Sequence, residues 1–378
     1  MKKRDLDKNV YDLACERIAH VYDRFDHVAV SFSGGKDSTV VLELTLAEAK
    51  KRQKTPLDVV FFDEEAQAPE TIEYLERTRR RDGISLRWYC LPVKHRNACS
   101  TKSPFWNPWA PEHADKWCRP LPEGAITELR GFDRHWIPEC APFVFPPEYG
   151  QVCWLLGIRA DESLRRRQSV SIRVHENYIA QHPSAPHVYI TKPIYDWRTN
   201  DVWTAPAKFG WDYNRAYDVM DKAGISRHAQ RVCPPYGEEP LQNLWMYSEC
   251  WPDLWEKMVL RVPGANTAAR YSRSPVYAFS GVPDKPEGMT WEQAIKAALD
   301  RWPREIAGQI AHSIKQLITL HNRASGGSPI PDKEPGESGV SWSFLYMIAI
   351  RGDLKGRKMA KRADYAMNAE KKAAKAKR

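Results

Sequence analysis

Short apolar stretches alternate with segments of helical spacing through the first part of the chain. Residues 27–32 and 57–62 are runs rich in β-branched and aromatic residues, which is typical of buried strands. Each is followed by a segment with the spacing of a helix, at 39–46 and 71–80, and a further apolar run at 86–91 continues the series. Strands that alternate with helices in this way predict a parallel sheet with right-handed crossovers, and therefore an α/β fold.

Two later parts of the chain depart from this alternation. Residues 95–150 are rich in proline and tryptophan and predict an irregular insertion, for which a lid is one interpretation. Strands are expected again at 151–158 and at 187–190, where the sheet closes. From about residue 240 the pattern becomes helical, with a long helical segment at 291–322, so we expect an α-rich C-terminal module.

The composition and charge of the chain indicate a cellular compartment and a class of ligand. Hydrophobic residues make up 42% and charged residues 28% of the chain, and no stretch approaches the roughly 20 apolar residues of a membrane span. The first residues contain no apolar signal segment, so we expect a cytoplasmic protein without a membrane partner. The net charge of +9 permits binding to the phosphates of nucleotides or nucleic acids. Much of the excess lies in residues 360–378, for which a solvated basic helix is the alternative to a nucleic-acid arm.

A glycine-rich hexapeptide joins the first predicted strand to its helix, and its sequence is Ser33-Gly34-Gly35-Lys36-Asp37-Ser38. Glycines allow the backbone to approach phosphate oxygens, and the free amides at a helix start donate hydrogen bonds to anions. Lys36 adds a positive charge, the two serine hydroxyls can bind phosphate, and Asp37 is a candidate Mg²⁺ ligand. A plain glycine turn, the alternative, would not require these polar residues. The spacing differs from the GxxxxGK[ST] of a Walker A loop.

The hexapeptide resembles the SGGxDS signature of the PP-loop, or N-type, ATP pyrophosphatases. Later segments resemble the phosphoadenosine phosphosulfate (PAPS) reductase-like branch, and the likeness covers roughly residues 25–240. Members split ATP between its α- and β-phosphates to adenylate a substrate, or bind an adenosine phosphosulfate in the same place. The resemblance implies a Rossmann-like, adenine nucleotide α-hydrolase-like domain that uses ATP and Mg²⁺. It also implies a phosphate cradle formed by Ser31 and the hexapeptide.

A second cluster follows the predicted strand 151–158. Residues 157–167, with the sequence GIRADESLRRR, resemble the G-x-R-x-x-E-S-x-x-R segment of the branch, in which Gly157 opens the motif. Arg159 and Arg166 are expected to clamp a polyphosphate and to stabilise the charge on the leaving group. Glu162 is expected to orient an arginine or a metal. An exposed, salt-bridged helix start is the alternative.

Three more residues are assigned to the site from the same resemblance. Asp63 ends the second predicted strand and precedes a P-E-T helix start, so it is expected to bind ribose or Mg²⁺, with a turn or cap as the alternative. Lys192 begins a K-P-I-x-D-W stretch, and Arg231 belongs to an R-V-C segment. Both are candidate phosphate ligands.

The chain departs from the assimilatory sulfonucleotide reductases at their cysteine motif. Those enzymes carry E-C-G-x-H near the C-terminus, whereas here the last of eight cysteines, Cys250, is followed by tryptophan and proline. Reduction of PAPS is therefore not expected, and Cys233 and Cys250 are the candidate nucleophiles if a sulfonucleotide is the substrate. The cysteines form no CxxC pair, so their spacing gives no support to a metal or iron–sulfur site.

The C-terminal part resembles the domain of unknown function attached to the PP-loop in phage- and plasmid-associated members. That group includes regulators of immunoglobulin-binding protein expression, so the likeness implies a ParB-like protein partner and a link to DNA. We expect a nucleotide domain at 1–240, an α-rich module at 241–354 and a basic tail at 355–378. Three functions compete: ATP-dependent adenylation, nucleotide sensing with a ParB-like partner or DNA, and sulfonucleotide transfer or reduction.

Overall fold

The structure of the protein is a computed structural model. It describes residues 7–162, 164–171, 176–227, 229–234, 236–237, 240–271, 284–334 and 338–354. The chain forms two compact units. The first consists of Met1–His95, Trp106–Pro234 and Met246–Arg261, and the second of Arg96–Phe105, Pro235–Trp245 and Val262–Arg378.

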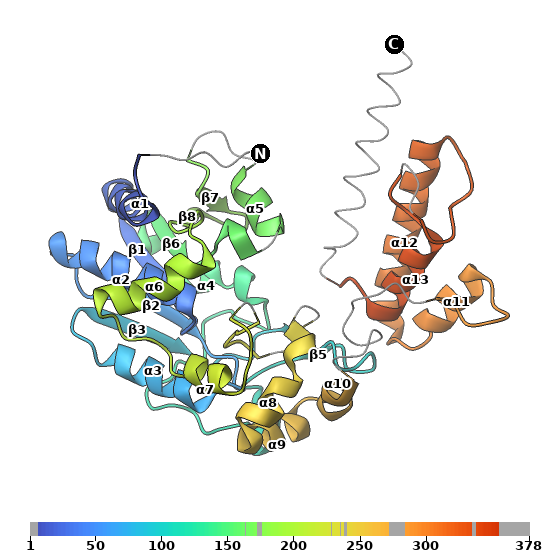
Figure 1. Ribbon diagram of the computed structural model, residues 1–378, viewed down its shortest axis with the longest axis horizontal. Helices are drawn as coiled ribbons and strands as arrows, with labels where there is room; N and C mark the ends of the chain where they lie inside the picture. The colour runs from blue at the N-terminus through green and yellow to red at the C-terminus, as the bar shows by residue number, and fades with distance from the viewer. Residues whose placement is uncertain are drawn as a thin grey trace, which may run out of the picture. The chain divides into compact units, whose positions relative to one another are not determined.

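A six-stranded sheet with the order β3-β2-β1-β6-β8-β7 forms the centre of the first unit (Figure 1). The strands that pair in parallel are β1 (His27–Ser31), β2 (Leu57–Phe62), β3 (Ile84–Tyr89), β6 (Val152–Leu156) and β8 (Ala185–Thr191). The edge strand β7 (Ile179–His182) runs antiparallel to β8. The predicted α/β fold with a mostly parallel sheet is confirmed, and β7 is the strand that the apolar pattern did not reveal.

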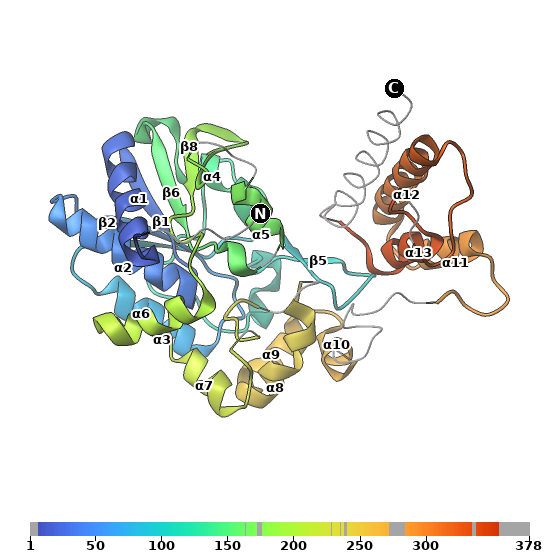
Figure 2. The same ribbon diagram turned by 45° about the horizontal axis from the view of Figure 1, so that its top comes forward.

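Helices cover one face of this sheet. They are α1 (Val10–Arg24), α2 (Lys36–Lys51), α3 (Pro69–Arg79) and α6 (Thr199–Phe209). Their buried residues share one hydrophobic cluster with Val28 and Val30 of β1 and with Val59 and Phe61 of β2. The views in Figures 1 and 2 place α1 and α2 side by side next to β1. Because α2 begins directly after β1, this packing holds the hexapeptide at the carboxyl end of a central strand.

The opposite face of the sheet is covered by part of the Pro/Trp-rich insertion. Val144 and Phe145 are buried in a second cluster with Ala29, Val60 and Trp154, whose positions alternate with those that face the helices. The alternation is the period of two expected of a strand that is buried on both faces. This part of the insertion is therefore hydrophobic core rather than a surface lid.

The remaining elements are short. The strands β4 (His95–Arg96) and β5 (Phe105–Trp106) form a two-stranded ribbon. The short helices are α4 (Ala141–Val144), α5 (Leu164–Ser171), α7 (Ala216–Lys222) and α8 (Trp245–Cys250). The 3-10 helices span Pro111–Lys116, Ile137–Glu139, Pro147–Tyr149, Ala160–Glu162 and Pro240–Asn243.

A buried carboxylate fixes α9 (Pro252–Arg261) to the end of β2 in the first unit. Glu65 is fully buried, and its oxygens accept hydrogen bonds from Arg261 Nε at 2.9 Å, Trp109 N at 2.8 Å and Cys118 N at 3.1 Å. A buried charge is tolerated only when it is paired and hydrogen-bonded in this way. The pair lies within the first unit, which includes Met246–Arg261, while the domain boundary near residue 240 stays a prediction.

The second unit is helical in its described part. It contains α10 (Ala265–Tyr271), α11 (Trp291–Leu299), α12 (Arg304–Ser325) and α13 (Trp342–Arg351), and the last three share a hydrophobic cluster. Trp302 separates α11 from α12, and its indole nitrogen donates a hydrogen bond to Ala349 O at 2.8 Å. No helix within the described residues is long and apolar enough to cross a membrane. The predicted basic tail, 355–378, lies outside the described residues.

Candidate functional site

The hexapeptide forms the turn between β1 and α2. Gly34 has a φ of +68°, a conformation that residues with a side chain rarely adopt, and this allows the chain to reverse direction sharply. Gly35 is the N-cap of α2 and has no side chain that could cap the helix, although the Lys36 amide donates to the Tyr217 hydroxyl. The first turn of α2 therefore offers backbone amides to an anion, and the helix dipole adds partial positive charge there.

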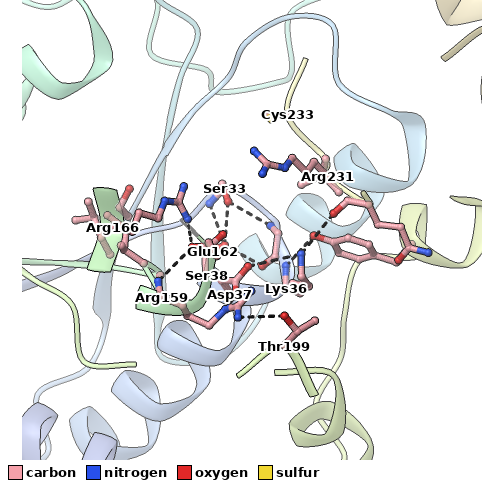
Figure 3. A pocket seen from close by; sticks show the side chains of 18 of the residues that line it. Ser33, Lys36, Asp37, Ser38, Arg159, Glu162, Arg166, Thr199, Arg231 and Cys233 are labelled. Atoms are coloured by element: carbon pink, nitrogen blue, oxygen red, sulfur yellow. Dashed lines mark hydrogen bonds and ion pairs between the residues drawn. The ribbon is translucent and has the colours of Figure 1, made fainter. Parts of the chain in front are cut away.

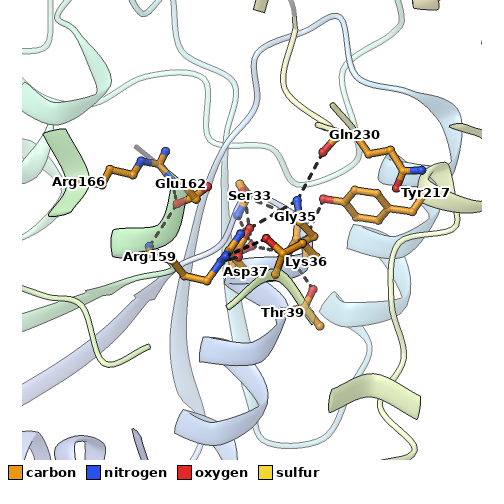
Figure 4. Close-up of polar contacts among 12 residues, drawn as sticks. Ser33, Gly35, Lys36, Asp37, Thr39, Arg159, Glu162, Arg166, Tyr217 and Gln230 are labelled. Carbon is orange, nitrogen blue, oxygen red and sulfur yellow. Dashed lines mark hydrogen bonds and ion pairs between the residues drawn. The ribbon is translucent and has the colours of Figure 1, made fainter. Parts of the chain in front are cut away.

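Two serine hydroxyls brace this turn from inside. Ser33 Oγ and Ser38 Oγ lie 3.1 Å apart, and the Ser38 hydroxyl donates to Gly35 O at 3.0 Å. The amide of Ser33 donates to Ser38 Oγ at 3.2 Å. The two serines thus hold the backbone of the loop in shape, as Figure 4 shows for Ser33 and its neighbours.

A cavity of about 510 Å³ opens at the loop. Most of the residues predicted for the site line it, namely Ser31, Ser33, Gly35, Lys36, Asp37, Ser38, Gly157, Arg159, Glu162, Arg166 and Arg231. Gly34, Asp63 and Lys192 are not in the lining. Cavities of roughly 300–1,000 Å³ are the usual size for small-molecule sites.

Asp37 joins the hexapeptide to the second cluster. Its Oδ1 accepts a short hydrogen bond from Nε of Arg159, and its Oδ2 lies 3.7 Å from Nζ of Lys36 (Figure 3). Arg159 is 3% exposed, so its guanidinium is fixed by its neighbours. The Arg159 Nη1 also donates to the Thr199 hydroxyl at 3.4 Å. Two cations are therefore held beside the amides of the loop, although they are 123 positions apart in the sequence, from 36 to 159.

Lys36 is also held by its neighbours. Its amide donates to the Tyr217 hydroxyl at 3.0 Å, and its Nζ donates to Gln230 O at 3.4 Å. Burial lowers the pKa of Lys36, the positive charges of Arg159 and Arg231 lower it further, and Asp37 opposes the shift. A nearby anion such as a phosphate would remove much of this repulsion.

Gly157 touches the loop directly. A Cβ atom added at Gly157 would lie 2.7 Å from the backbone carbon of Asp37 and 2.7 Å from the amide nitrogen of Ser38. Real Cβ atoms do not come that close to backbone atoms, so any side chain at this position would displace the loop. The close approach explains why a glycine opens the second cluster.

Three more arginines surround the cavity. Arg166 Nη1 donates a short hydrogen bond to Glu162, and Glu162 also accepts from the Arg159 amide at 3.2 Å. Arg227 and Arg231 are exposed, and within the described residues neither makes a hydrogen bond or ion pair. Figure 3 shows Arg166 and Arg231 on different sides of the loop. The side chains of Arg227 and Arg231 are therefore available to bind an anionic ligand.

Comparison with known proteins agrees with this geometry. The pattern of the phosphoadenosine phosphosulfate reductase domain matches residues 27–220, just over half of the chain, and includes both clusters of the site up to Arg166. The chain belongs to this family. A domain of unknown function, DUF3440, matches residues 224–332, so this PAPS reductase-like protein carries a second family domain at its C-terminal side. The predicted family and its two-part architecture are confirmed.

Two curated relatives are also similar to this PAPS reductase-like protein. The Escherichia coli K12 protein described as uncharacterized protein YbdN is 31% identical over 371 residues, which cover 93% of this chain and 90% of the relative. The Methanocaldococcus jannaschii protein described as uncharacterized protein MJ0066 is 27% identical over 246 residues, 64% of this chain and 42% of the relative.

Two solved structures match part of the chain with low TM-scores. The FMN adenylyltransferase of Candida glabrata is 15% identical, with a TM-score of 0.35 over 57% of this chain and 62% of that one. The PAPS reductase of Candida auris, in a phosphate complex, is 13% identical, with a TM-score of 0.32 over 58% of this chain and 94% of that one.

Two predicted site residues of this PAPS reductase-like domain lie elsewhere. Asp63 is 1% exposed, and its carboxylate accepts hydrogen bonds from Trp88 Nε1 at 2.7 Å, from the amide of Glu65 at 2.8 Å and from Arg119. The carboxylate oxygens of Asp63 are therefore hydrogen-bonded within the core, and Asp63 does not line the cavity. Lys192 is also buried, and its Nζ donates to the Ser169 hydroxyl at 2.8 Å.

Some lining residues were not assigned from the sequence. They are Phe61, Phe62, Glu64, Gln67, Leu156, Ile158, Asp161, Thr199, Tyr217, Arg227, Gln230 and Val232. Tyr217 belongs to a Y-N-x-x-Y-D segment that contributed to the resemblance, so a signal was present for it. Gln230 acts through its backbone carbonyl, which a sequence pattern does not reveal.

Proposed function

We propose that this protein binds Mg²⁺·ATP in the cavity at the hexapeptide and adenylates an acceptor, with release of pyrophosphate. One observation carries the proposal: the start of α2, Lys36 and the buried guanidinium of Arg159 converge on one cavity. Donors and cations fixed in advance stabilise negative charge as it develops, without further reorganisation. Membership of a nucleotide-acting family supports the same class of ligand.

The three catalytic candidates have separate roles in this proposal. A bond forms from the acceptor to the α-phosphorus, while the bond between that phosphorus and the α–β bridging oxygen breaks and its electron pair leaves with pyrophosphate. Lys36 and Arg159, which both lie beside Asp37, stabilise the charge on the leaving group. Arg166 is oriented by Glu162 and contacts the same phosphates from the other wall.

Mg²⁺ belongs to the proposal as a companion of the nucleotide. Among the described residues, no three His, Cys, Asp or Glu side chains converge as a metal site. Mg²⁺ usually needs only one or two carboxylates together with phosphate oxygens and waters. Asp37 fits this requirement, because its carboxylate lines the cavity beside the loop. The metal would supply positive charge to the phosphates.

The first test uses ATP labelled separately at the α- and γ-positions, with Mg²⁺ and with or without cell extract. We expect α-labelled AMP or an α-labelled adduct together with pyrophosphate. Lys36→Ala should reduce pyrophosphate release by about 100-fold or more, since removal of one fixed donor costs that much in comparable sites. Lys51→Ala, on the exposed end of the same helix, is the matched control. Full activity of the Lys36→Ala protein would refute the assigned role of the loop.

One observation favours a second candidate function. Cys233 lines the same cavity as Arg166 and Arg231, so a thiol lies at a site suited to an anionic nucleotide. Under this alternative the protein transfers or reduces the sulfonate of an adenosine phosphosulfate. Cys250 is not in the lining. Burial raises the pKa of both thiols, that of Cys233 to about 11, so a bound ligand would have to favour the thiolate. Unchanged sulfonucleotide turnover in Cys233→Ser and Cys250→Ser proteins would eliminate this version.

The partner and the compartment also remain proposals. We propose a cytoplasmic protein whose basic tail, 355–378, contacts DNA or a ParB-like partner and allows the nucleotide site to act as a sensor. A basic tail that binds DNA displaces the cations condensed on the DNA phosphates. Its binding should therefore weaken steeply as the salt concentration rises. A chain that ends at residue 354 should lose this binding and keep its affinity for ATP. DNA binding that does not depend on salt would argue against the tail.

A further inference from the structure

A second cavity, of about 540 Å³, lies beside the nucleotide cavity in the first unit. Its walls come from α2, α6 and α7 and from the segment between α6 and α7. Four residues line both cavities: Lys36, Tyr217, Arg227 and Gln230. A molecule in the second cavity would therefore lie next to the residues that hold the phosphate loop.

Aromatic side chains dominate this second cavity. Trp203, Trp211, Tyr213 and Tyr217 all line it. The rings of Trp203 and Tyr217 meet edge to face, with centroids 4.9 Å apart. The indole nitrogen of Trp203 is buried, and within the described residues it has no hydrogen-bond partner. Aromatic walls of this kind bind planar rings by stacking.

The same rings already accommodate a cation. Nζ of Lys36 lies 5.8 Å from the ring centroid of Trp203 and 5.4 Å from that of Tyr217. Both distances are within the range of a cation–π interaction. The two rings therefore offset part of the cost of burying the Lys36 ammonium, whose pKa burial lowers.

The charged residues that line both cavities are positive, whereas the charged residues that line only the second cavity are acidic. Lys36 and Arg227 are shared with the nucleotide cavity, where bound phosphates would compensate them. Asp218 and Asp221 line only the second cavity. Asp218 accepts a hydrogen bond from the Tyr213 hydroxyl at 3.0 Å, and Asp221 is exposed. Asp218 also lies 3.9 Å from Nη1 of Arg215 in an exposed ion pair. With a nucleotide in place, the second cavity therefore presents aromatic rings and two carboxylates, of which Asp221 makes no ion pair within the described residues.

We propose that the second cavity binds the acceptor of the adenylyl group, and that this acceptor carries a planar aromatic ring beside a positively charged group. This inference rests on the proposed adenylation, since it names the substrate class of that reaction. The shared wall keeps such an acceptor adjacent to the phosphates, and the carboxylates select it against anionic ring compounds.

The test uses the full chain, a nucleotide that cannot be cleaved between its α- and β-phosphates (AMPCPP, with Mg²⁺) and two small probes. Tryptamine has an indole ring and an ammonium group, and indole-3-propionate has the same ring with a carboxylate. Calorimetric titration and saturation-transfer NMR measure binding of each. With AMPCPP bound, tryptamine should bind at least about tenfold more tightly than indole-3-propionate, and more tightly than it binds the free protein.

Two variants and one control locate the binding. Trp211→Ala should weaken tryptamine by about fivefold to tenfold, as expected for the loss of one stacking ring. Asp218→Asn/Asp221→Asn keeps the shape of the cavity and should abolish the preference for the cationic probe. Trp255→Ala, on α9 and in the lining of neither cavity, should bind tryptamine as the unmodified chain does.

The outcomes separate this inference from the proposed function. AMPCPP binding without saturable tryptamine binding, or with no preference between the two probes, would overturn the acceptor assignment and leave the nucleotide site intact. Tryptamine binding to a protein that does not bind AMPCPP would also overturn it, because the cavity would then serve something other than adenylation.

Discussion

At the scale of single residues, the contact between Gly157 and the phosphate loop makes a sharp prediction. In Gly157→Ala the new methyl group would need space that the backbone of Asp37 and Ser38 occupies, so the loop must move. We expect the affinity for AMPCPP, measured by calorimetry, to fall by at least about tenfold, the equivalent of roughly 1.4 kcal/mol.

Gly308→Ala is the matched control for this change. Gly308 lies on α12, and a Cβ built there meets no atom within 4 Å. The same substitution should therefore leave nucleotide affinity unchanged and stabilise the helix slightly. Wild-type affinity for AMPCPP in Gly157→Ala would mean that the loop tolerates displacement. The contact of Gly157 with the backbone of Asp37 and Ser38 would then not matter for nucleotide binding.

The residues of the site also differ in how visible they are in the sequence. The hexapeptide is contiguous, so its glycines and Lys36 could be assigned from local chemistry. Asp63 follows a strand in the same way, but Trp88 and Arg119 take up its carboxylate. Only side chains from other segments decide this, and they are not neighbours of Asp63 in the sequence.

At the scale of elements, a charged group ties three neighbouring strands together. Asp58 on β2 accepts hydrogen bonds from His27 on β1 at 2.7 Å and from Arg87 on β3 at 2.8 Å. Burial by itself would raise the pKa of Asp58, but the hydrogen bonds and charges of His27 and Arg87 outweigh it, and the pKa is lowered. In Asp58→Asn, His27 and Arg87 lose the carboxylate that accepts their hydrogen bonds. The free energy of unfolding should therefore fall by about 1–3 kcal/mol at neutral pH.

The sign of the pH dependence follows from this lowered pKa. The unfolded chain takes up the proton first, near the ordinary value of 3.8, so the contribution of Asp58 is full above that pH. It is lost as the pH falls through the lower value of the folded protein. Urea unfolding at several pH values should show the difference between wild type and Asp58→Asn shrinking in acid. A difference that is independent of pH would contradict the assignment.

The buried pair between Glu65 and Arg261 should matter more than any surface pair of the protein. In Arg261→Met the carboxylate of Glu65 would remain fully buried without its cation. We expect a loss of about 3–5 kcal/mol, measured by urea unfolding followed by tryptophan fluorescence.

Lys257→Met, an exposed position on the same helix, should cost little. Equal stability of the two variants would show that α9 is not anchored by this pair. The helical period of α9 is a local feature, whereas its hydrogen bond to Glu65 joins residues 196 positions apart.

At the scale of the whole molecule, the two compact units should respond differently to nucleotide. The hexapeptide and both cavities belong to the first unit, whereas α12 and α13 belong to the second. Hydrogen exchange measured by mass spectrometry with saturating AMPCPP should show slower exchange in α2 and in the segment around Gly157. A ligand at about 100 times its Kd stabilises the bound state by about 2.7 kcal/mol.

Exchange in α12 and α13 should stay unchanged in the same experiment. Protection that is limited to α12 and α13 would place the nucleotide outside the cavity at the hexapeptide. The loop variant Lys36→Ala is the comparison. AMPCPP should not slow hydrogen exchange in either unit of this variant.

The sequence by itself determined the parallel α/β fold, the family and the position of the glycine-rich loop between β1 and α2, because these depend on periods and motifs within a few consecutive residues. The tertiary structure alone decided that Arg159 pins Asp37, that Asp63 and Lys192 lie away from the cavity, and that part of the insertion is core. It also decided that aromatic residues of α6 and α7 enclose a second cavity beside Lys36. The physical reason is that burial and pairing are set by segments far apart in the chain, and no local pattern specifies which of them meet.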